Sequence, residues 1–219
     1  MTRDVGLYIS VISARQWPAR FGESLAMLMF NLGLKHLDGR LNGLTLKVAR
    51  QAHPSMTRGE HLTEALKDGF THFLSLDDDQ TFPADVVERM LAAAKPILTC
   101  NYRKKQEKLE YVCSGVDSQM LDSTHKTGLE RIKAMGMGMA LIDLAAIAHI
   151  QPPYFSAVWN ADEGKMWIED TVFSYLLWNH GVEMWCDHDL SREIGHVGEF
   201  EYRLPPYAPS ALALVEEAA

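Results

Sequence analysis

The stretch FLSLDDDQTF, residues 73–82, joins an apolar segment of strand length to three consecutive carboxylates. The carboxylates, Asp77, Asp78 and Asp79, come just before a helix that we expect to begin near Pro83. Ligands of open α/β sheets bind at the carboxyl ends of the strands, so this position indicates a site. Like charges packed this closely repel one another, and a bound cation would relieve the repulsion.

The spacing of the carboxylates indicates how they would hold a cation. Alternate side chains of an extended segment share a face, so Asp77 and Asp79 are predicted to converge on one ion while Asp78 points elsewhere. Oxygen ligands of this kind suit Mg²⁺ or Mn²⁺. The alternative is a solvated acidic turn that caps the following helix, because Asp is common before helices.

The composition is that of one ordinary α/β domain. The chain has 219 residues, 47% of them hydrophobic, which is enough for one substantial core. Its formal net charge of −8 argues against sequence-independent binding of nucleic acid, which needs a basic surface. Cys100, Cys113 and Cys186 lack the spacing of metal ligands, and we expect reduced core thiols in a cytoplasmic protein.

The apolar segment Val5–Ile12 is short and lacks the positively charged start of a signal peptide, so we expect a buried first strand. No segment approaches the ~20 apolar residues of a transmembrane helix. The sequence therefore predicts no transmembrane segment.

Strand-like and helix-like segments alternate along the chain, which predicts a single domain with a mostly parallel central sheet and helices on both faces. The predicted strands are Val5–Ile12, Leu44–Ala49, Phe73–Leu76, Pro96–Cys100, Met137–Ile142 and Val182–Cys186. The predicted helices are Gly22–Gly33, Arg58–Gly69, Pro83–Ala94 and Asp170–His180. We place the domain at residues 1–203, followed by a tail or docking helix over 204–219. The polar segment 101–133 is either a solvated hairpin or loop or an element that grips a substrate.

Two acids, Glu169 and Asp170, open the last predicted helix. Acids in a first turn complement the helix dipole, which is one explanation for them. The other is that one of them is a general base, and Asp170 is the better candidate if Glu169 is occupied with capping.

His196 lies between two glycines, where its imidazole could reach back to an ion, although any one of nine histidines is more often surface or core. An imidazole added to two carboxylates would shift the preference towards Mn²⁺. Asp187 and Asp189 form a second D-x-D pair, ranked behind the first because no strong apolar strand and following helix frame it.

Glycines and arginines near the predicted strands offer further candidates. Gly136 and Gly138 do not form a dinucleotide signature, but they would let the backbone approach a sugar or keep the strand start tight. Arg58 precedes the central strand, where its guanidinium would either pair with a diphosphate or remain on the surface.

Together these landmarks resemble the GT-A fold glycosyltransferases, particularly compact family-2-like enzymes of bacterial and phage type. The D-x-D at residues 77–79, the glycine-bearing strand at 136–142, the E-D pair at 169–170 and the late H-x-G at 196–198 occur in the family's order. The resemblance covers roughly residues 5–200. The segment after Ile12 departs from the family's nucleotide loop, which leaves the base specificity open.

The resemblance implies a metal-dependent transfer of a sugar from a nucleotide-sugar donor to a glycan or other hydroxyl-bearing acceptor. Asp77 and Asp79 would bind Mn²⁺ or Mg²⁺ with the nucleotide diphosphate, and His196 would complete the metal ligands. Asp77, Asp78, Asp79 and Arg58 would contact the donor. Of the catalytic pair Glu169 and Asp170, Asp170 would be the base that activates the acceptor hydroxyl if the reaction inverts the anomeric centre.

Two other interpretations use the same residues. Asp77-Asp78-Asp79-Gln80-Thr81 also satisfies the D-x-D-x-T of haloacid-dehalogenase-like phosphatases, in which Asp77 would be the nucleophile and Asp79 the acid/base. That motif normally lies on the first strand, which is not its position here. A non-catalytic nucleotide-sugar-binding module would keep the D-x-D and dispense with the base.

Overall fold

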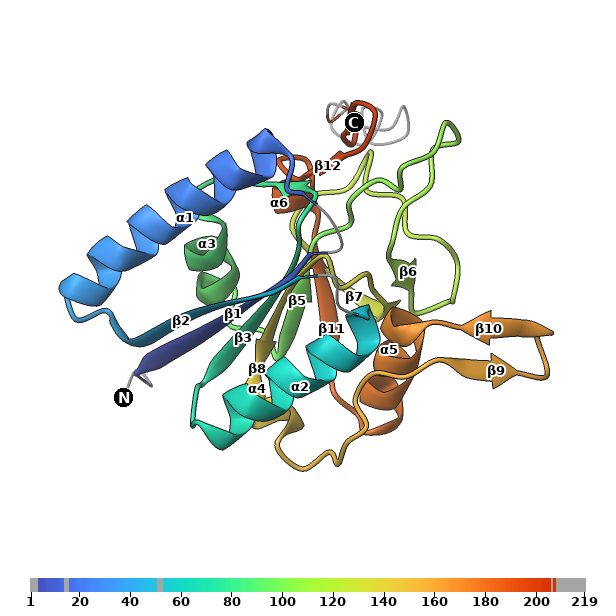
Figure 1. The fold of residues 1–219 in the computed structure, drawn as a ribbon. Helices are drawn as coiled ribbons and strands as arrows, with labels where there is room; N and C mark the ends of the chain where they lie inside the picture. The colour runs from blue at the N-terminus through green and yellow to red at the C-terminus, as the bar shows by residue number, and fades with distance from the viewer. Residues whose placement is uncertain (1–3, 14–15, 51–52, 206, 208–219) are drawn as a thin grey trace, which may run out of the picture.

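The computed structural model describes residues 4–13, 16–50, 53–205 and 207, which form layers of helices around a central sheet (Figure 1). The helices are α1 (Ala19–Leu37), α2 (Pro54–Lys67), α3 (Val86–Ala92), α4 (Leu144–Ile147), α5 (Glu169–Asn179) and α6 (His188–Ser191). The strands are β1 (Val5–Ser13), β2 (Leu41–Arg50), β3 (His72–Asp77), β4 (Gln80–Thr81), β5 (Ile97–Thr99), β6 (Ser114–Gly115), β7 (Leu129–Ala134), β8 (Met139–Asp143), β9 (Val158–Asn160), β10 (Lys165–Trp167), β11 (Met184–Asp187), β12 (Gly195–Val197) and β13 (Glu201–Tyr202).

In the described part of the chain, eight strands form the main sheet in the order β2-β1-β3-β8-β5-β11-β7-β6. β1 pairs in parallel with β2 and β3, and β5 pairs in parallel with β11. β8 and β7 run against their neighbours. The predicted fold class, a mostly parallel sheet in one α/β domain, is confirmed, with two reversed strands inserted in it.

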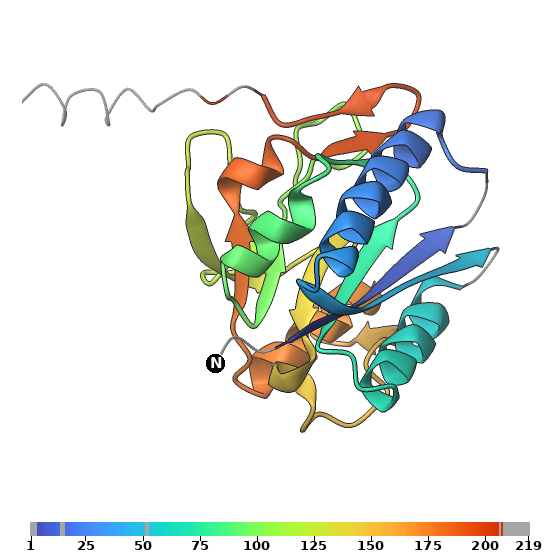
Figure 2. The same ribbon diagram turned by 90° about the vertical axis from the view of Figure 1, so that its left-hand side faces the viewer.

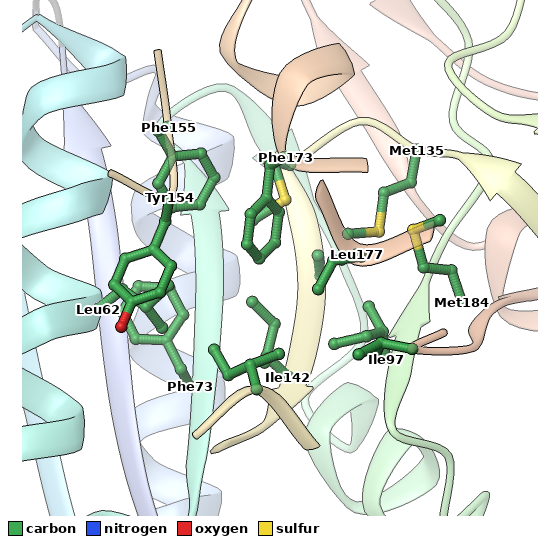
Figure 3. Close-up of a cluster of buried hydrophobic side chains, with 14 of the residues drawn as sticks. Leu62, Phe73, Ile97, Met135, Ile142, Tyr154, Phe155, Phe173, Leu177 and Met184 are labelled. Atoms are coloured by element: carbon green, nitrogen blue, oxygen red, sulfur yellow. The ribbon is translucent and has the colours of Figure 1, made fainter. Parts of the chain in front are cut away.

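Each face of the sheet buries its own apolar core. Along β1, Leu7, Ile9 and Val11 pack towards α1 and α3, while Tyr8 joins the opposite core with α2 and α5. This alternation follows from the two-residue period of a strand. Figure 3 shows the core that includes Tyr8, where Leu62 of α2 lies beside Phe73 of β3 and the ring of Phe173 of α5 packs against Phe155. The two cores hold the strand ends of the sheet in fixed positions.

Two smaller sheets extend the domain. β4 pairs with β12, and β12 pairs with β13, all antiparallel. Figure 2 shows β12 and β13 side by side at the top of the view. β9 and β10 form a separate hairpin that projects from the body of the molecule next to α5 (Figure 1).

Several predicted boundaries are corrected by the structure. α2 begins at Pro54 rather than Arg58, because a proline suits the first helical position. α3 begins at Val86 rather than Pro83, since the chain enters it through a turn closed by the Val86 amide on the Pro83 carbonyl at 3.1 Å. The predicted tail falls mostly on residues 206 and 208–219, outside the described residues.

Cys100, Cys113 and Cys186 are buried free thiols, as predicted. None of the helices in the described ranges combines the length and the hydropathy that crossing a bilayer requires.

Candidate active site

The acidic stretch forms a turn at the edge where β3 leaves the sheet. β3 ends at Asp77, Asp78 and Asp79 form the turn, and the chain then enters β4 at Gln80. The predicted convergence of Asp77 and Asp79 assumed an extended segment, and the turn removes that alternation. The two carboxylates therefore contact different partners in this structure.

The pairing of β4 with β12 brings His196 to Asp79. His196 lies opposite Gln80 in this ladder, and the Val197 amide donates to the Asp79 carbonyl at 2.7 Å. His196 Nε2 lies 3.3 Å from Asp79 Oδ1. A histidine more than 110 residues downstream of the acidic stretch thus faces its third carboxylate.

The hydrogen bond at the other ring nitrogen fixes what His196 presents to Asp79. Nδ1 lies 2.9 Å from the carbonyl oxygen of Arg103, and a carbonyl only accepts, so Nδ1 carries the proton. Nε2 then faces Asp79 Oδ1, and although burial alone would raise the pKa of Asp79, its contacts with His196 and Lys105 lower it. In the described part of the chain Asp79 Oδ1 is buried without a hydrogen-bond partner. A carboxylate oxygen that faces an imidazole, whose other nitrogen donates to a backbone carbonyl, is an arrangement that suits a shared cation.

Arg58 is the centre of a buried ionic cluster. Its side chain is 4% exposed, and its guanidinium pairs with Asp77, with Glu169 at 3.1 Å and with Asp170 at 3.4 Å. The alternative of a surface arginine is therefore wrong, and the guanidinium contacts carboxylates instead. Three carboxylates around one guanidinium leave a local excess of negative charge.

A lysine from the polar segment after β5 contacts the acidic turn. Lys105 Nζ pairs with Asp79 Oδ2. The backbone of the same segment supplies the Arg103 carbonyl that orients His196. This part of the segment 101–133 is thus a wall of the site rather than a fully solvated loop.

Gly138 allows several polar groups to crowd against the backbone at the start of β8. A Cβ there would lie 2.6 Å from Tyr102 Oη, 2.8 Å from Asp77 Oδ2 and 3.0 Å from Gln80 Nε2. The Gly138 amide donates to Tyr102 Oη at 2.9 Å. Among the described residues, both amide atoms of Gln80 are also buried without a hydrogen-bond partner. Tight packing of the strand start, one of the two expectations for this glycine, is what the contacts support.

Asp170 lies in the first turn of α5, between the Arg58 cluster and an open cleft. Its Oδ2 accepts from the Met137 amide at 3.2 Å. Burial raises the pKa of Asp170 to about 6, helped by Asp77 and Glu169 and opposed by Arg58. Asp170 also lines a cleft of about 830 Å³. A carboxyl with a raised pKa at the wall of a cleft is suited to accepting a proton near neutral pH.

Glu169 and the second D-x-D pair have other contacts. Glu169 pairs with Arg58, and no side chain caps α5. Asp187 caps α6 by accepting from the Leu190 amide, and Asp189 pairs with Arg192 at 3.0 Å. The second pair therefore stabilises local structure.

The side chains at the acidic turn offer a hard or borderline divalent ion two protein ligands, Asp79 and His196. Within the described residues, no three His, Cys, Asp or Glu side chains gather into a metal-binding group. Asp79 Oδ1 and His196 Nε2 are an oxygen and a nitrogen ligand that face each other at 3.3 Å. Mg²⁺ at nucleotide sites commonly takes one or two carboxylates and completes its shell with phosphate and water. Asp79 and His196 meet that requirement, and Asp77 would add to it on leaving Arg58.

Three residues of this site were not predicted individually. Tyr102 and Gln80 are polar groups buried by the tertiary packing, and Lys105 is one of several neighbouring lysines and arginines. Gln80 could have been predicted from its position, because it directly follows the acidic turn at the carboxyl end of β3. Nothing in the sequence distinguishes Lys105 from Lys104.

No protein-family model and no curated protein sequence matches the chain. Solved structures with a similar fold include A197 from STIV, with a TM-score of 0.61 and 14% identity over 94% of this chain and 97% of that one. They also include GalNAc-T7 with UDP, GalNAc and Mn²⁺, with a TM-score of 0.52 and 11% identity over 96% of this chain and 46% of that one. At these identities the likeness concerns the fold, and it supports the GT-A-like architecture.

Proposed function

We propose that this protein is a metal-dependent glycosyltransferase that moves a sugar from a nucleotide-sugar donor to an acceptor hydroxyl. The observation that carries the proposal is the meeting of Asp79 Oδ1 and His196 Nε2, a carboxylate oxygen and an imidazole nitrogen 3.3 Å apart, at the carboxyl end of the central strand β3. GalNAc-T7, which has a similar fold, was solved with UDP, GalNAc and Mn²⁺, and this supports a nucleotide sugar and a divalent metal as the proposed ligands.

In this proposal Asp79 and His196 hold Mn²⁺ or Mg²⁺, and Asp77 and Asp78 face the donor from the same turn. A bound divalent ion would stabilise the negative charge that develops on the departing diphosphate. In this proposal Arg58 does not make the direct contact with the diphosphate that was expected of it. It instead holds Asp77 in place next to the donor.

Asp170 is the proposed base, and Glu169 keeps Arg58 in place beside it. In an inverting transfer, the acceptor oxygen forms a bond to the anomeric carbon while the bond from that carbon to the phosphate oxygen breaks. The electron pair of the broken bond stays on the nucleoside diphosphate, and the acceptor proton moves to Asp170. The raised pKa of Asp170, about 6, makes its carboxylate a competent acceptor at neutral pH.

We extend the proposal to the organisation of the chain. Residues 1–203 would form the catalytic unit, because β1, early in the chain, pairs through Ile12 with Asp77, and β12, late in the chain, supplies His196. The three buried free thiols agree with a reducing compartment such as the cytoplasm.

A thermal-shift and chemical-denaturation screen of nucleoside diphosphates and nucleotide sugars, with and without Mn²⁺ or Mg²⁺, tests the proposal. A ligand at about 100 times its dissociation constant should add ~2.7 kcal/mol of stability. We expect one nucleoside diphosphate to stabilise the wild type only with metal, and Asp79→Asn and His196→Gln to lose the effect. Asp189→Asn is the matched control from the second D-x-D pair and should keep it.

Two outcomes would contradict the proposal. Stabilisation by a phosphate analogue with Mg²⁺, and by no nucleotide, would favour the phosphatase interpretation. Metal-dependent nucleotide binding with a biological activity that Asp170→Asn leaves intact would favour a binding module without transfer.

A further inference from the structure

The cleft beside Asp170 is enclosed by three segments of the chain. Residues 104–114 of the polar segment form one wall, residues 134–136 at the end of β7 form the floor, and residues 163–171 form the other wall. The last of these runs from the β9–β10 hairpin into the first turn of α5, so the hairpin and Asp170 are joined by a short piece of chain. The volume of about 830 Å³ is within the range of small-molecule sites, ~300–1,000 Å³.

The charged residues that line the cleft balance one another. They are the cations Lys104, Lys108 and Lys165 and the carboxylates Glu110, Glu163 and Asp170. Each lysine is already paired, Lys104 and Lys108 with Glu110 and Lys165 with Glu163. A phosphorylated or otherwise anionic ligand would have to compete for these ammonium groups. The balance favours a neutral ligand whose many polar groups exchange hydrogen bonds with carboxylates and hydroxyls.

An aromatic ring is held in place at the same wall. Trp167 is partly exposed and lines the cleft. Its ring packs edge-on against Tyr175 of α5 at 5.3 Å between centroids, and its Nε1 donates to Glu163 at 3.3 Å. These two contacts orient the indole, so a ligand would not bear the full cost of ordering it.

We propose that this cleft is the acceptor subsite and that the acceptor is an uncharged saccharide packed against Trp167. The inference rests on the proposed transferase function and names the acceptor class for it. One face of a pyranose ring is made of C–H groups, which the negative face of an indole attracts. The sugar hydroxyls are matched by Glu110, Glu163 and Ser114, and the hydroxyl that reacts is directed to Asp170.

The hairpin provides its own control residue. Trp159 is 59% exposed and lies opposite Met166 in the β9–β10 ladder, whereas Trp167 lies opposite Val158. Opposed residues share a face and neighbouring residues alternate, so Trp159 and Trp167 belong to different faces of the hairpin. Trp159 does not line the cleft. Replacing each tryptophan with alanine removes the same side chain from the same element.

The test is binding of labelled full-length protein to an array of immobilised mono- and oligosaccharides, with and without UDP and Mn²⁺. We expect the wild type to retain a defined set of uncharged glycans and Trp167→Ala to weaken their binding at least tenfold. Trp159→Ala should bind them as the wild type does, and Trp167→Phe should recover part of the affinity. Trp167→Ala must keep the metal-dependent nucleotide response, which shows that it is folded.

Other outcomes overturn the inference. A wild type that retains no glycan in either condition, or glycan binding that Trp167→Ala leaves unchanged, would exclude a saccharide subsite at Trp167. Binding to phosphatidylcholine vesicles that requires Trp167 would assign the hairpin to a lipid surface instead. Glycan binding that depends on Trp167, in a wild type with no response to any nucleotide, would support the cleft and contradict the transferase function. The two failures are therefore distinguishable.

Discussion

At the scale of single residues, the site is a problem of charge compensation. Asp77, Glu169 and Asp170 surround Arg58, and Asp79 is paired with Lys105 and faces His196. Four carboxylates in a small volume are tolerated because each of them has a partner. Removing a partner should change the behaviour of the carboxylate that it leaves.

Replacing Lys105 with alanine should strengthen the binding of Mn²⁺ in the absence of nucleotide. The ammonium of Lys105 competes with any cation that approaches Asp79, and a partly exposed ion pair of this kind contributes ~0.5–1 kcal/mol. The expected decrease in the Mn²⁺ dissociation constant is about two- to fivefold, measured by isothermal titration calorimetry. Lys104→Ala removes the same charge from the neighbouring position, where it pairs with Glu110, and should have little effect. Weaker binding in Lys105→Ala would show that Lys105 assists the metal site.

Asp170 should make the stability of the fold depend on pH. Its pKa is raised by burial from 3.8 to about 6, so the folded state holds the proton more tightly than the unfolded state. The stability that this provides is present below about pH 4 and is lost as the pH rises through about 6. The free energy of unfolding of the wild type, from urea titrations, should therefore fall relative to that of Asp170→Asn over this interval. Asp189→Asn should follow the wild type, and parallel curves for Asp170→Asn and the wild type would contradict the assignment.

At the scale of elements, the site depends on where strands and helices begin and end. β3 ends at Asp77, α5 begins at Glu169, and α2 presents Arg58 one turn after its start at Pro54. The pairing of β4 with β12 adds His196 from the far end of the chain. The start of β8, with Gly138, closes the site from the side of the sheet.

Alanine should have opposite effects at two glycines of this framework. At Gly138 the added Cβ meets Tyr102, Asp77 and Gln80 within 3.0 Å, so Gly138→Ala should lower the free energy of unfolding by ~1–3 kcal/mol and weaken the binding of metal and nucleotide. At Gly59, inside α2, nothing lies within 4 Å, and Gly59→Ala should raise it by ~0.5–1 kcal/mol. Denaturant titrations of both variants check the pair. Equal effects at the two positions would mean that the crowding at Gly138 is relieved by movement of its neighbours.

At the scale of the whole molecule, the two cores hold rigid strand ends, while the site is completed by late and peripheral segments. α1 and α3 cover one face of the sheet, and α2 and α5 cover the other (Figure 1). Asp77 and Arg58 belong to this framework. β12 is attached to it through the short strand β4, and the Val197 amide donates to the Asp79 carbonyl.

Ligand binding should therefore protect β12 from hydrogen exchange. If Asp79 and His196 bind one ion, the ion links the framework to β12 and lowers the population of states in which this short strand opens. Mn²⁺ with a nucleoside diphosphate should slow the exchange of amides in residues 195–197, and Asp79→Asn should abolish the change. Mass spectrometry of peptic peptides measures both. Unchanged exchange of this segment on binding would separate His196 from the metal site.

The parts of the fold and the site that could be predicted are those marked by a short-range sequence pattern. The apolar segments predicted six of the eight strands that the described chain contributes to the central sheet, and the acidic stretch after β3 marked the edge where the site lies. The two missed strands, β6 and β7, lie largely in the polar segment 101–133 and lack a continuous apolar run. The boundaries of α2 and α3 were missed by several residues, because Pro54 and Pro83 enter a helix and a turn respectively. Lys105 carried no distinguishing signal, since its role depends on where the polar segment folds.

Local patterns in the sequence were sufficient to predict the α/β alternation, the burial of β1 and β3, the carboxylates at a strand end, and His196 and Asp170 as candidate site residues. These follow from short-range patterns: residue periodicity, charge and the preferences of turns. Contacts between distant parts of the chain bury Arg58 among three carboxylates, reverse β8 and β7 in the sheet, and give Asp77 and Asp79 different partners. Such features arise from pairings between residues tens to more than a hundred positions apart, whose energies depend on burial and geometry and leave no trace in a local pattern.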